Sequence, residues 1–136
     1  MENSPTPVPV VAAALRDAAG RLLLQQCPAH KRHAGRWEFP GGKVEDQEDQ
    51  ILALCREILE ELGIELVPER LDPAGVAEEP PHEGRPGLVL KLYTSTAWRG
   101  NPEGREGQRW GWFTLGEAAA LDLPPMDRAL LEGLSG

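Results

Sequence analysis

The sequence predicts an α/β fold in which a mixed β-sheet has helices on its faces. One observation leads to this fold class, and a second indicates a single domain. Short apolar runs typical of strands alternate with segments of helical periodicity, which is the order of elements in α/β domains. The 136 residues suit one modest hydrophobic core, and no stretch has the composition of a linker between domains. We therefore expect residues 1–136 to form a single domain.

The first part of the chain is expected to contain two strands and a loop. Residues 8–15 are apolar and rich in valine, as in a buried strand. Residues 16–20 have the composition of a hairpin turn, so residues 21–26 are expected to form the returning strand. Residues 27–40 are polar and basic and are expected to form a surface loop.

A helix is predicted from about Asp46 to Leu62. Its apolar residues recur at spacings of three and four and form one stripe, made of Ile51, Leu54, Cys55, Ile58 and Leu62. Gly63 follows at the position where a glycine often ends a helix.

The remainder of the chain predicts short strands and two further helices. Strands are expected at residues 64–67, 74–79, 88–97 and 110–113, with a loop over 99–109. Thr114 and Glu117 have the spacing of a capping box, which predicts a short helix through Leu121. A last helix is expected from about Met126 to Leu134.

The acidic composition narrows the classes of function. A formal net charge of −8 disfavours binding of long nucleic acid, which needs a basic surface. No apolar run approaches the roughly 20 residues that span a bilayer, and residues 1–9 lack the pattern of a secretory signal. We expect a cytoplasmic monomer or homodimer with no membrane partner. The thiols of Cys27 and Cys55 are expected to stay reduced.

Three glutamates of the predicted helix form one acidic patch. Glu57, Glu60 and Glu61 are spaced i, i+3 and i+4, so their side chains leave the helix close together. Like charges at this spacing destabilise a helix, and Arg56 is expected to project at a different angle. Magnesium commonly joins one or two carboxylates to substrate phosphates. A divalent-cation site therefore explains the patch better than a solvated acidic face.

Two other phosphate or metal motifs fit poorly. An EF-hand would need spaced Asp or Asn residues around a central glycine, and that pattern is absent. A P-loop would need a hydroxyl residue after Gly42-Lys43 and an upstream glycine, whereas the chain has Val44 and Trp37 there.

The segment from Gly42 to Ile64 resembles the Nudix box, whose pattern is G-x5-E-x7-R-E-U-x-E-E-x-G-U with U a bulky aliphatic residue. Every specified position is satisfied, by Gly42, Glu48, Arg56, Glu57, Ile58, Glu60, Glu61, Gly63 and Ile64. A chance match is on the order of 10⁻¹⁰ per starting position. Residues 37–43 resemble the lead-in of the MutT branch of this family. The resemblance implies the Nudix fold, a mixed sheet sandwiched between helices (α/β/α).

The resemblance also implies a metal centre. In similar enzymes the box glutamates hold Mg²⁺, or Mn²⁺, against the substrate phosphates. The corresponding ligands are Glu57, Glu60, Glu61 and the carbonyl of Gly42. A later loop often adds a carboxylate, and residues 104–108 resemble that loop, so Glu106 is the candidate, with Glu103 as the neighbouring alternative. Glu48 and Arg56 are expected to form a structural pair, the alternative being an ordinary surface ion pair.

The implied reaction is substitution at phosphorus by water. In MutT-like enzymes the attack occurs at the β-phosphorus and gives a nucleoside monophosphate and pyrophosphate. A carboxylate accepts the proton of the attacking water. Glu57 is the favoured base, with Glu61 and Glu106 as rivals.

Recognition of the nucleobase points to two positions. Phe39 is placed like an aromatic residue that contacts the base in MutT relatives, the alternative being a core residue. Residues 123–127 resemble the segment that contacts the base, with Asp127 where the bacterial 8-oxo-dGTP enzyme has asparagine. A carboxylate only accepts hydrogen bonds, which suits the amino group of cytosine, whereas a protonated Asp127 suits oxidised guanine. The alternative for Asp127 is an N-terminal cap of the last helix.

A second departure concerns Cys27, where relatives commonly have arginine beside the phosphate or sugar. Arg36, Lys31 and Lys43 are the candidates to supply that contact. Trp98, Trp110 and Trp112 are expected to pack in the protein rather than to stack on a base.

The sequence therefore favours a nucleotide-pool hydrolase, with 8-oxo-dGTP and CTP or dCTP as competing substrates. One alternative is a diphosphate derivative such as ADP-ribose. Another is a non-catalytic nucleotide-binding Nudix domain. Such domains usually lose box glutamates, and this chain keeps them, which favours an enzyme.

Overall fold

The computed structural model describes residues 6–27 and 34–134. Its strands are β1 (Val8–Leu15), β2 (Leu22–Gln26), β3 (Trp37–Glu38), β4 (Gly41–Lys43), β5 (Glu65–Leu66), β6 (Asp72–Glu79), β7 (Leu88–Ser95), β8 (Trp98–Arg99) and β9 (Trp110–Phe113). Its helices are α1 (Gln50–Leu62), α2 (Leu115–Ala119) and α3 (Pro125–Glu132), with a 3₁₀ turn at Pro68–Arg70. None of the helices in the described residues is long and apolar enough to cross a bilayer.

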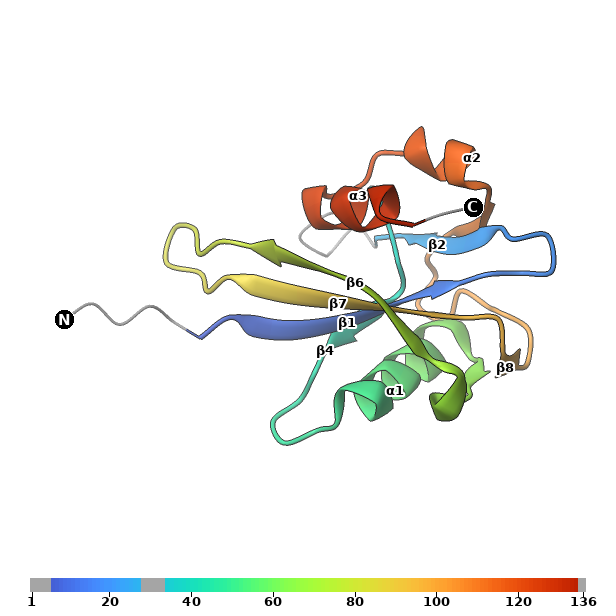
Figure 1. The fold of residues 1–136 in the computed structure, drawn as a ribbon, viewed down its shortest axis with the longest axis horizontal. Coiled ribbons are helices and arrows are strands. Elements are labelled where there is room, and N and C mark those ends of the chain that lie inside the picture. Colours follow the sequence, from blue (N-terminus) through green and yellow to red (C-terminus); the bar gives the residue numbers. More distant parts are fainter. Residues whose placement is uncertain (1–5, 28–33, 135–136) are drawn as a thin grey trace.

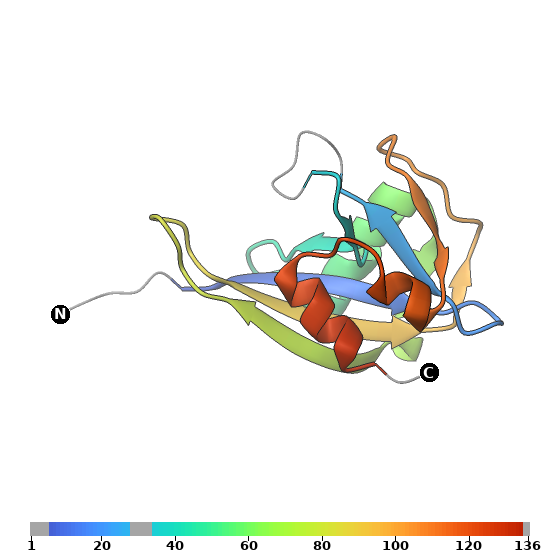
Figure 2. The same cartoon turned by 90° about the horizontal axis from the view of Figure 1, so that it is seen from above.

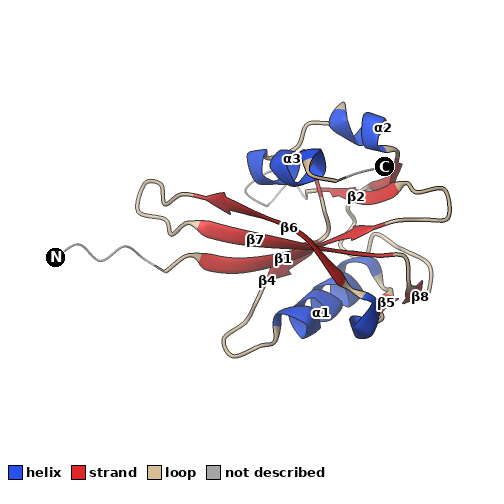
Figure 3. Cartoon of the chain, in the orientation of Figure 1, coloured by secondary structure: helices blue, strands red, loops and turns tan. Residues whose placement is uncertain are grey.

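The central sheet is mixed, as the sequence predicts. It has the strand order β4-β1-β7-β6, in which β1 and β7 run parallel and the other neighbours antiparallel. A second sheet has the order β3-β2-β9, and β5 pairs with β8. Helix α1 lies on one side of the central sheet, and α2 and α3 lie on the other (Figures 1 and 3). The predicted arrangement of helices on both faces of a mixed sheet is confirmed.

Strand β1 separates two hydrophobic cores. Successive side chains of a strand point to opposite faces, so a strand with apolar residues throughout is buried on both. Ala12 and Ala14 pack with Leu130 of α3, whereas Val11 and Ala13 belong to the other core. That other core contains the apolar stripe of α1, namely Leu54, Ile58 and Leu62. In this arrangement α1, which carries the glutamates, packs against β1 and β4.

The predicted turn after β1 is present, but the two strands separate beyond it. Asp17 closes the turn, because its carboxylate accepts hydrogen bonds from the backbone N–H groups of Ala19 and Arg21 at 3.0 and 2.8 Å. One isolated bridge joins Arg16 to Leu22. Away from this bridge the two strands belong to different sheets, β1 to the central sheet and β2 to the second sheet. The gap that opens between these sheets holds the cavity described below.

Element boundaries differ from the sequence prediction in several places, and the short strand β8 falls at the start of the predicted loop over residues 99–109. Residues 34–43 contain β3 and β4 where a loop and a glycine pair are expected, because β2 and β1 supply their hydrogen-bonding partners. Helix α1 begins at Gln50 rather than near Asp46. Helix α2 ends at Ala119, two residues before the predicted end, and α3 begins at Pro125. The predicted capping box at Thr114 and Glu117 is confirmed.

Candidate active site

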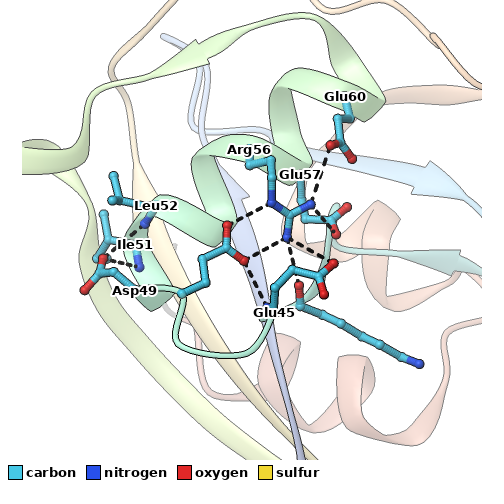
Figure 4. Close-up of polar contacts among 9 residues, drawn as sticks. Glu45, Asp49, Ile51, Leu52, Arg56, Glu57 and Glu60 are labelled. Atoms are coloured by element: carbon cyan, nitrogen blue, oxygen red, sulfur yellow. Dashed lines mark hydrogen bonds and ion pairs between the residues drawn. The ribbon is translucent and has the colours of Figure 1, made fainter.

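Helix α1 presents the glutamate patch. Asp49 caps its first turn by accepting hydrogen bonds from the backbone N–H groups of Ile51 and Leu52 at 3.0 and 3.1 Å (Figure 4). Gly63 ends the helix in the left-handed conformation, with a φ of 71°. These two ends and the buried apolar stripe fix the rotation of α1 about its axis. Glu57 and Glu61 therefore face β4, and Glu60 is exposed.

Arg56 is the central cation of this patch, which corrects the expectation that it projects away. Its guanidinium donates from Nε and Nη2 to the two carboxylate oxygens of Glu48, at 2.8 and 3.0 Å. It also lies 3.3 Å from Glu57 and 3.5 Å from Glu60, and Nη2 donates to the carbonyl of Lys43 (Figure 4). The long Arg56 side chain turns back along α1, so it partly neutralises the repulsion between the glutamates.

The absence of a side chain at Gly42 determines where the carboxylate of Glu57 can lie. A Cβ at position 42 would overlap the carboxylate of Glu57, so the glycine leaves room for that carboxylate beside β4. The backbone of Gly42 does not need glycine for its own conformation, because its φ lies outside the left-handed range. The glycine that opens the Nudix-box pattern therefore serves the position of a neighbouring carboxylate.

Glu61 is a buried carboxyl group, only 7% exposed. One of its oxygens accepts hydrogen bonds from the side-chain amide of Gln25 and from the backbone N–H of Gly41, both at 3.1 Å. Burial raises the pKa of Glu61 to about 8, and the negative charges of Glu57 and Glu106 add to the rise, against the lowering effect of the Gln25 hydrogen bond. A buried acid in a field of like charges is a group that a cation would stabilise in its charged form.

The loop with Glu106 docks on the C-terminal end of α1. The backbone N–H groups of Glu103 and Arg105 donate to the carbonyls of Leu62 and Glu61, at 2.9 and 3.0 Å. A Cβ at Gly63 would overlap the guanidinium of Arg105, so the glycine also leaves room for this side chain. The structure thus brings Glu106 to the same cavity as Glu61, although 45 positions separate them in the sequence.

A cavity of about 210 Å³ connects the acidic cluster to an apolar end. Its carboxylate-bearing wall is formed by Glu38, Glu61 and Glu106 together with Gly41 and Gly42. Its apolar wall is formed by Val10, Ala12, Cys27, Phe39, Leu88, Leu90 and Met126, with Asp127 among them. The volume is below the roughly 300–1,000 Å³ of typical drug-sized ligand sites, so the cavity suits one portion of a larger ligand.

Asp127 and Phe39 are coupled across the apolar end. The carboxylate of Asp127 accepts a hydrogen bond from the backbone N–H of Phe39 at 3.1 Å, and both residues line the cavity. Asp127 is 6% exposed, and burial raises the pKa of its carboxyl group to about 6 despite the Phe39 hydrogen bond. Pro124 holds the N-cap position of α3, so Asp127 lies in the first turn and is not the cap. Phe39 belongs to the core and lines the cavity, which combines both predicted interpretations.

Two of the three basic residues that were predicted to contact the substrate lie away from the cavity. Arg36 is half exposed and lies 3.8 Å from Asp122, and the exposed Lys43 contributes its carbonyl to Arg56. Neither lines the cavity, and Lys31 lies outside the described residues. Substrate binding by Arg36 and Lys43 therefore stays a prediction. Cys27 directly follows β2 and is buried in the cavity wall, and both cysteines are free thiols as expected.

The three tryptophans of the predicted packing group contact one another. Trp98 stacks on Trp112 with ring centroids 5.8 Å apart, and Trp110 meets Trp112 edge to face at 6.4 Å. They pack against the core beneath α1 and do not line the cavity. Their predicted role in packing is confirmed.

Comparisons with known proteins agree with the geometry. The model of the NUDIX domain family matches residues 6–134. The chain belongs to the Nudix family. It is 40% identical to the CTP pyrophosphohydrolase of Escherichia coli over 90% of this chain and 87% of that protein. It is 32% identical to the 8-oxo-dGTP diphosphatase of Haemophilus influenzae over 93% of this chain and 90% of the relative.

Solved structures match this Nudix protein over nearly its whole length. The MutT NUDIX hydrolase of Burkholderia pseudomallei has a TM-score of 0.85 at 31% identity, covering 96% of this chain and all of the other. The ORF135 protein of Escherichia coli has a TM-score of 0.80 at 35% identity, covering 94% and 88%. The family, the α/β/α fold and the assignment as a Nudix hydrolase therefore hold for this chain.

Nudix hydrolases generally use divalent metal ions, and the donor set of this one fits such an ion. Among the described residues no group of three or more His, Cys, Asp or Glu side chains is arranged so that it could hold a metal ion as it stands. Arg56 holds Glu57 and Glu60, while Gln25 and Gly41 hold Glu61. Magnesium needs no closed cage, because it commonly takes one or two carboxylates and completes its shell with water and substrate phosphates. The all-oxygen donors and the raised pKa of Glu61 fit that requirement.

Two buried polar residues beside the candidate site were missed by sequence reasoning. Gln25 and Gln108 are buried and hydrogen-bonded to Glu61, yet neither belongs to the Nudix box. A glutamine that follows three leucines on a strand with buried residues on both faces was the available signal for Gln25. No local pattern distinguishes Gln108 from the rest of its polar loop.

Proposed function

We propose that this Nudix hydrolase cleaves a nucleoside triphosphate to a nucleoside monophosphate and pyrophosphate, as a nucleotide-pool enzyme of the MutT type. The observation that supports this most directly is the single cavity that joins the carboxylates of Glu61 and Glu106 to an apolar end containing Asp127. A nucleotide has the same division, with phosphates at one end and a flat base at the other. The base would enter the cavity, and the triphosphate would extend along α1.

The carboxylates are assigned to one Mg²⁺ centre, which Mn²⁺ would also occupy. The ligands are Glu57, Glu60, Glu61, Glu106 and the Gly42 carbonyl. The ion supplies neutralisation of the phosphate oxygens and acidification of a bound water. Glu48 and Arg56 are structural, since they brace the loop before α1 against the helix.

Hydrolysis requires one base and one leaving group. A water oxygen bonds to the β-phosphorus, the bond from that phosphorus to the oxygen bridging the α- and β-phosphates breaks, and the nucleoside monophosphate leaves. A carboxylate accepts the water proton. Glu57 is the favoured base, and its carboxylate lies against Gly42 of β4. Glu61 and Glu106 are the alternatives, because both line the cavity itself.

Cytosine is the favoured base. The buried carboxylate of Asp127 accepts hydrogen bonds, and the amino group of cytosine donates them. The similarity to a CTP pyrophosphohydrolase over most of both chains supports this choice. The second candidate is 8-oxo-dGTP, which several similar proteins hydrolyse according to their names. It is favoured by the raised pKa of Asp127, because a protonated carboxyl can also donate.

The test is release of pyrophosphate from a panel of triphosphates, with and without Mg²⁺. The panel contains CTP, dCTP, 5-methyl-dCTP, dGTP and 8-oxo-dGTP, with ADP-ribose as the diphosphate alternative. We expect metal-dependent release that is fastest for one cytosine or oxidised-guanine substrate, and its loss in Glu57→Gln. Hydrolysis of ADP-ribose alone would replace the proposal by that alternative, and no turnover of any substrate would favour a binding domain.

A further inference from the structure

Two buried glutamines join the Glu106 loop to the carboxylate of Glu61. The side-chain amide nitrogen of Gln108 donates to the Oε1 atom of Gln25 at 2.9 Å and to the backbone carbonyl of Glu61 at 3.0 Å. The amide nitrogen of Gln25 donates to Glu61 Oε1 at 3.1 Å. The Oε1 atom of Gln108 accepts from the backbone N–H of Glu106 at 2.9 Å. Gln25 and Gln108 are only 3% and 8% exposed.

The hydrogen bonds at Gln108 have a fixed direction. Its amide lies between a backbone N–H, which can only donate, and a backbone carbonyl, which can only accept. The oxygen of Gln108 must therefore face Glu106, and its nitrogen must face Glu61. That leaves a donor directed at Gln25, which must present its oxygen to Gln108 and its nitrogen to the Glu61 carboxylate. Two backbone groups thus determine which end of Gln25 meets Glu61.

We infer that Gln108 and Gln25 act as an amide relay that positions Glu61 and Glu106 relative to each other. Gln108 fixes the orientation of Gln25, and Gln25 holds the Glu61 carboxylate toward the cavity. The same Gln108 side chain holds the peptide of Glu106 on the end of α1, beside the anchor from Arg105 to the Glu61 carbonyl. Both glutamines are positioning residues. Their effect on turnover rests on the proposed function, whereas their effect on geometry and metal affinity does not.

A buried relay is sensitive to a change in one member. Removing the Gln108 amide leaves the Gln25 oxygen without its buried donor, so nothing then prevents the Gln25 amide from rotating out of the orientation in which it donates to Glu61. A carboxylate at position 108 would accept from Glu106 but could not donate to Gln25, so it would favour that rotation. Hydrogen-bonding partners behind metal ligands typically contribute 10–100-fold to metal affinity or activity.

The experiment compares Gln108→Met, which keeps the length without hydrogen bonds, with Gln108→Glu. The matched control is Gln26→Met, because the Gln26 amide donates to the carbonyl of Gly35 and has no link to Glu61. Three quantities are measured. They are the hydrogen-exchange rate of the Glu106 amide by NMR, the Mn²⁺ affinity of the nucleotide-free protein by electron paramagnetic resonance, and kcat and KM for the favoured triphosphate.

We expect both Gln108 variants to remain folded, with at least tenfold faster exchange at Glu106 and Mn²⁺ affinity weakened 10–100-fold. We expect kcat to fall more than KM changes, and Gln26→Met to match wild type. Unchanged Mn²⁺ affinity in folded Gln108→Met, or an equal loss in the Gln26→Met control, would overturn the relay. Because exchange and Mn²⁺ affinity need no nucleotide, they decide the relay even if the wild-type protein hydrolyses no triphosphate.

Discussion

Arg56 and Glu48 form a two-pronged pair in which Nε and Nη2 of the guanidinium each donate to a different carboxylate oxygen, at 2.8 and 3.0 Å. The backbone N–H of Glu45 donates to the same carboxylate at 2.9 Å. The pair joins the loop before α1 to the middle of the helix. Because Arg56 also contacts Glu57 and Glu60, the pair links the loop geometry to two proposed metal ligands.

Glu48→Gln should lower the free energy of unfolding at pH 7. The hydrogen bonds from Arg56 lower the pKa of Glu48 to about 2, from an ordinary value of 4.5. A carboxyl with a depressed pKa adds stability that is present above 4.5 and is lost as the pH falls toward 2. The difference between wild type and variant should therefore shrink over that range, as measured by urea unfolding at a series of pH values. Glu45→Gln is the control, since Glu45 is exposed and lies 4.0 Å from Arg56. A difference that is constant with pH would contradict the pairing.

Gly42→Ala should impair the metal site without unfolding the protein. The added methyl group would displace the Glu57 carboxylate, while the backbone of Gly42 tolerates alanine. We expect a 10–100-fold loss of Mn²⁺ affinity or of kcat, with an unchanged circular dichroism spectrum. Gly116→Ala on α2 is the control, because only a Thr114 oxygen, 4.0 Å away, approaches the added atom. Equal effects of the two substitutions would show that Gly42 has no special relation to Glu57.

Much of the candidate metal site was predictable because most of its residues lie in one continuous segment. The box fixes the spacing of Glu57, Glu60 and Glu61 on one helix, and helical geometry brings their side chains close together on one face. The side-chain direction of Arg56 was not predictable, because it depends on where the preceding loop places Glu48. That loop is shaped by the pairing of β4 with β1, which has no local sequence signal in Gly41–Lys43.

The fold was predictable to a similar degree. The continuous apolar run of β1 indicated a strand buried on both faces, and the two cores confirm it. The strands β3 and β4 were missed because they are only two and three residues long and pair with distant partners. The link between Gln25 and Gln108 spans 83 positions and forms only once β9, which follows Gln108, pairs with β2 (orange and blue in Figure 2).

Glu61→Gln should stabilise the metal-free protein at alkaline pH. Burial raises the pKa of Glu61 from 4.5 to about 8, so the folded state binds a proton more tightly than the unfolded state. Stability is therefore greatest below pH 4.5 with respect to this group, and falls as the pH rises toward 8. The slope contributed by one such group is at most about 1.4 kcal/mol per pH unit.

The measurement is urea unfolding between pH 5 and 8, with and without Mn²⁺. Wild type should lose stability with rising pH when metal-free and regain it with Mn²⁺, which favours the charged carboxylate. The Glu61→Gln variant should show a flatter pH dependence and a smaller gain from Mn²⁺. Wild-type stability independent of pH and Mn²⁺ would remove Glu61 from the metal site.

Asp127→Asn should change which base is preferred. The amide oxygen of asparagine can still accept from the Phe39 N–H, so the fold should be retained, but the variant presents a donor to the base. Hydrogen bonds to charged groups contribute about 1.5–3 kcal/mol, so kcat/KM for CTP should fall roughly ten- to a hundredfold, mainly through KM. The ratio of kcat/KM for 8-oxo-dGTP to that for CTP should rise.

The pH profile separates this role from a structural one. Burial raises the pKa of Asp127 to about 6, so its carboxyl gains a proton, and with it a donor, as the pH falls through 6. In wild type the 8-oxo-dGTP to CTP ratio should therefore rise below pH 6, whereas the Asp127→Asn ratio should stay flat. Steady-state kinetics on both substrates from pH 5 to 8 measure this ratio in the wild type and in the variant. A variant that keeps the wild-type ratio at every pH would show that Asp127 does not contact the base and serves only to hold Phe39.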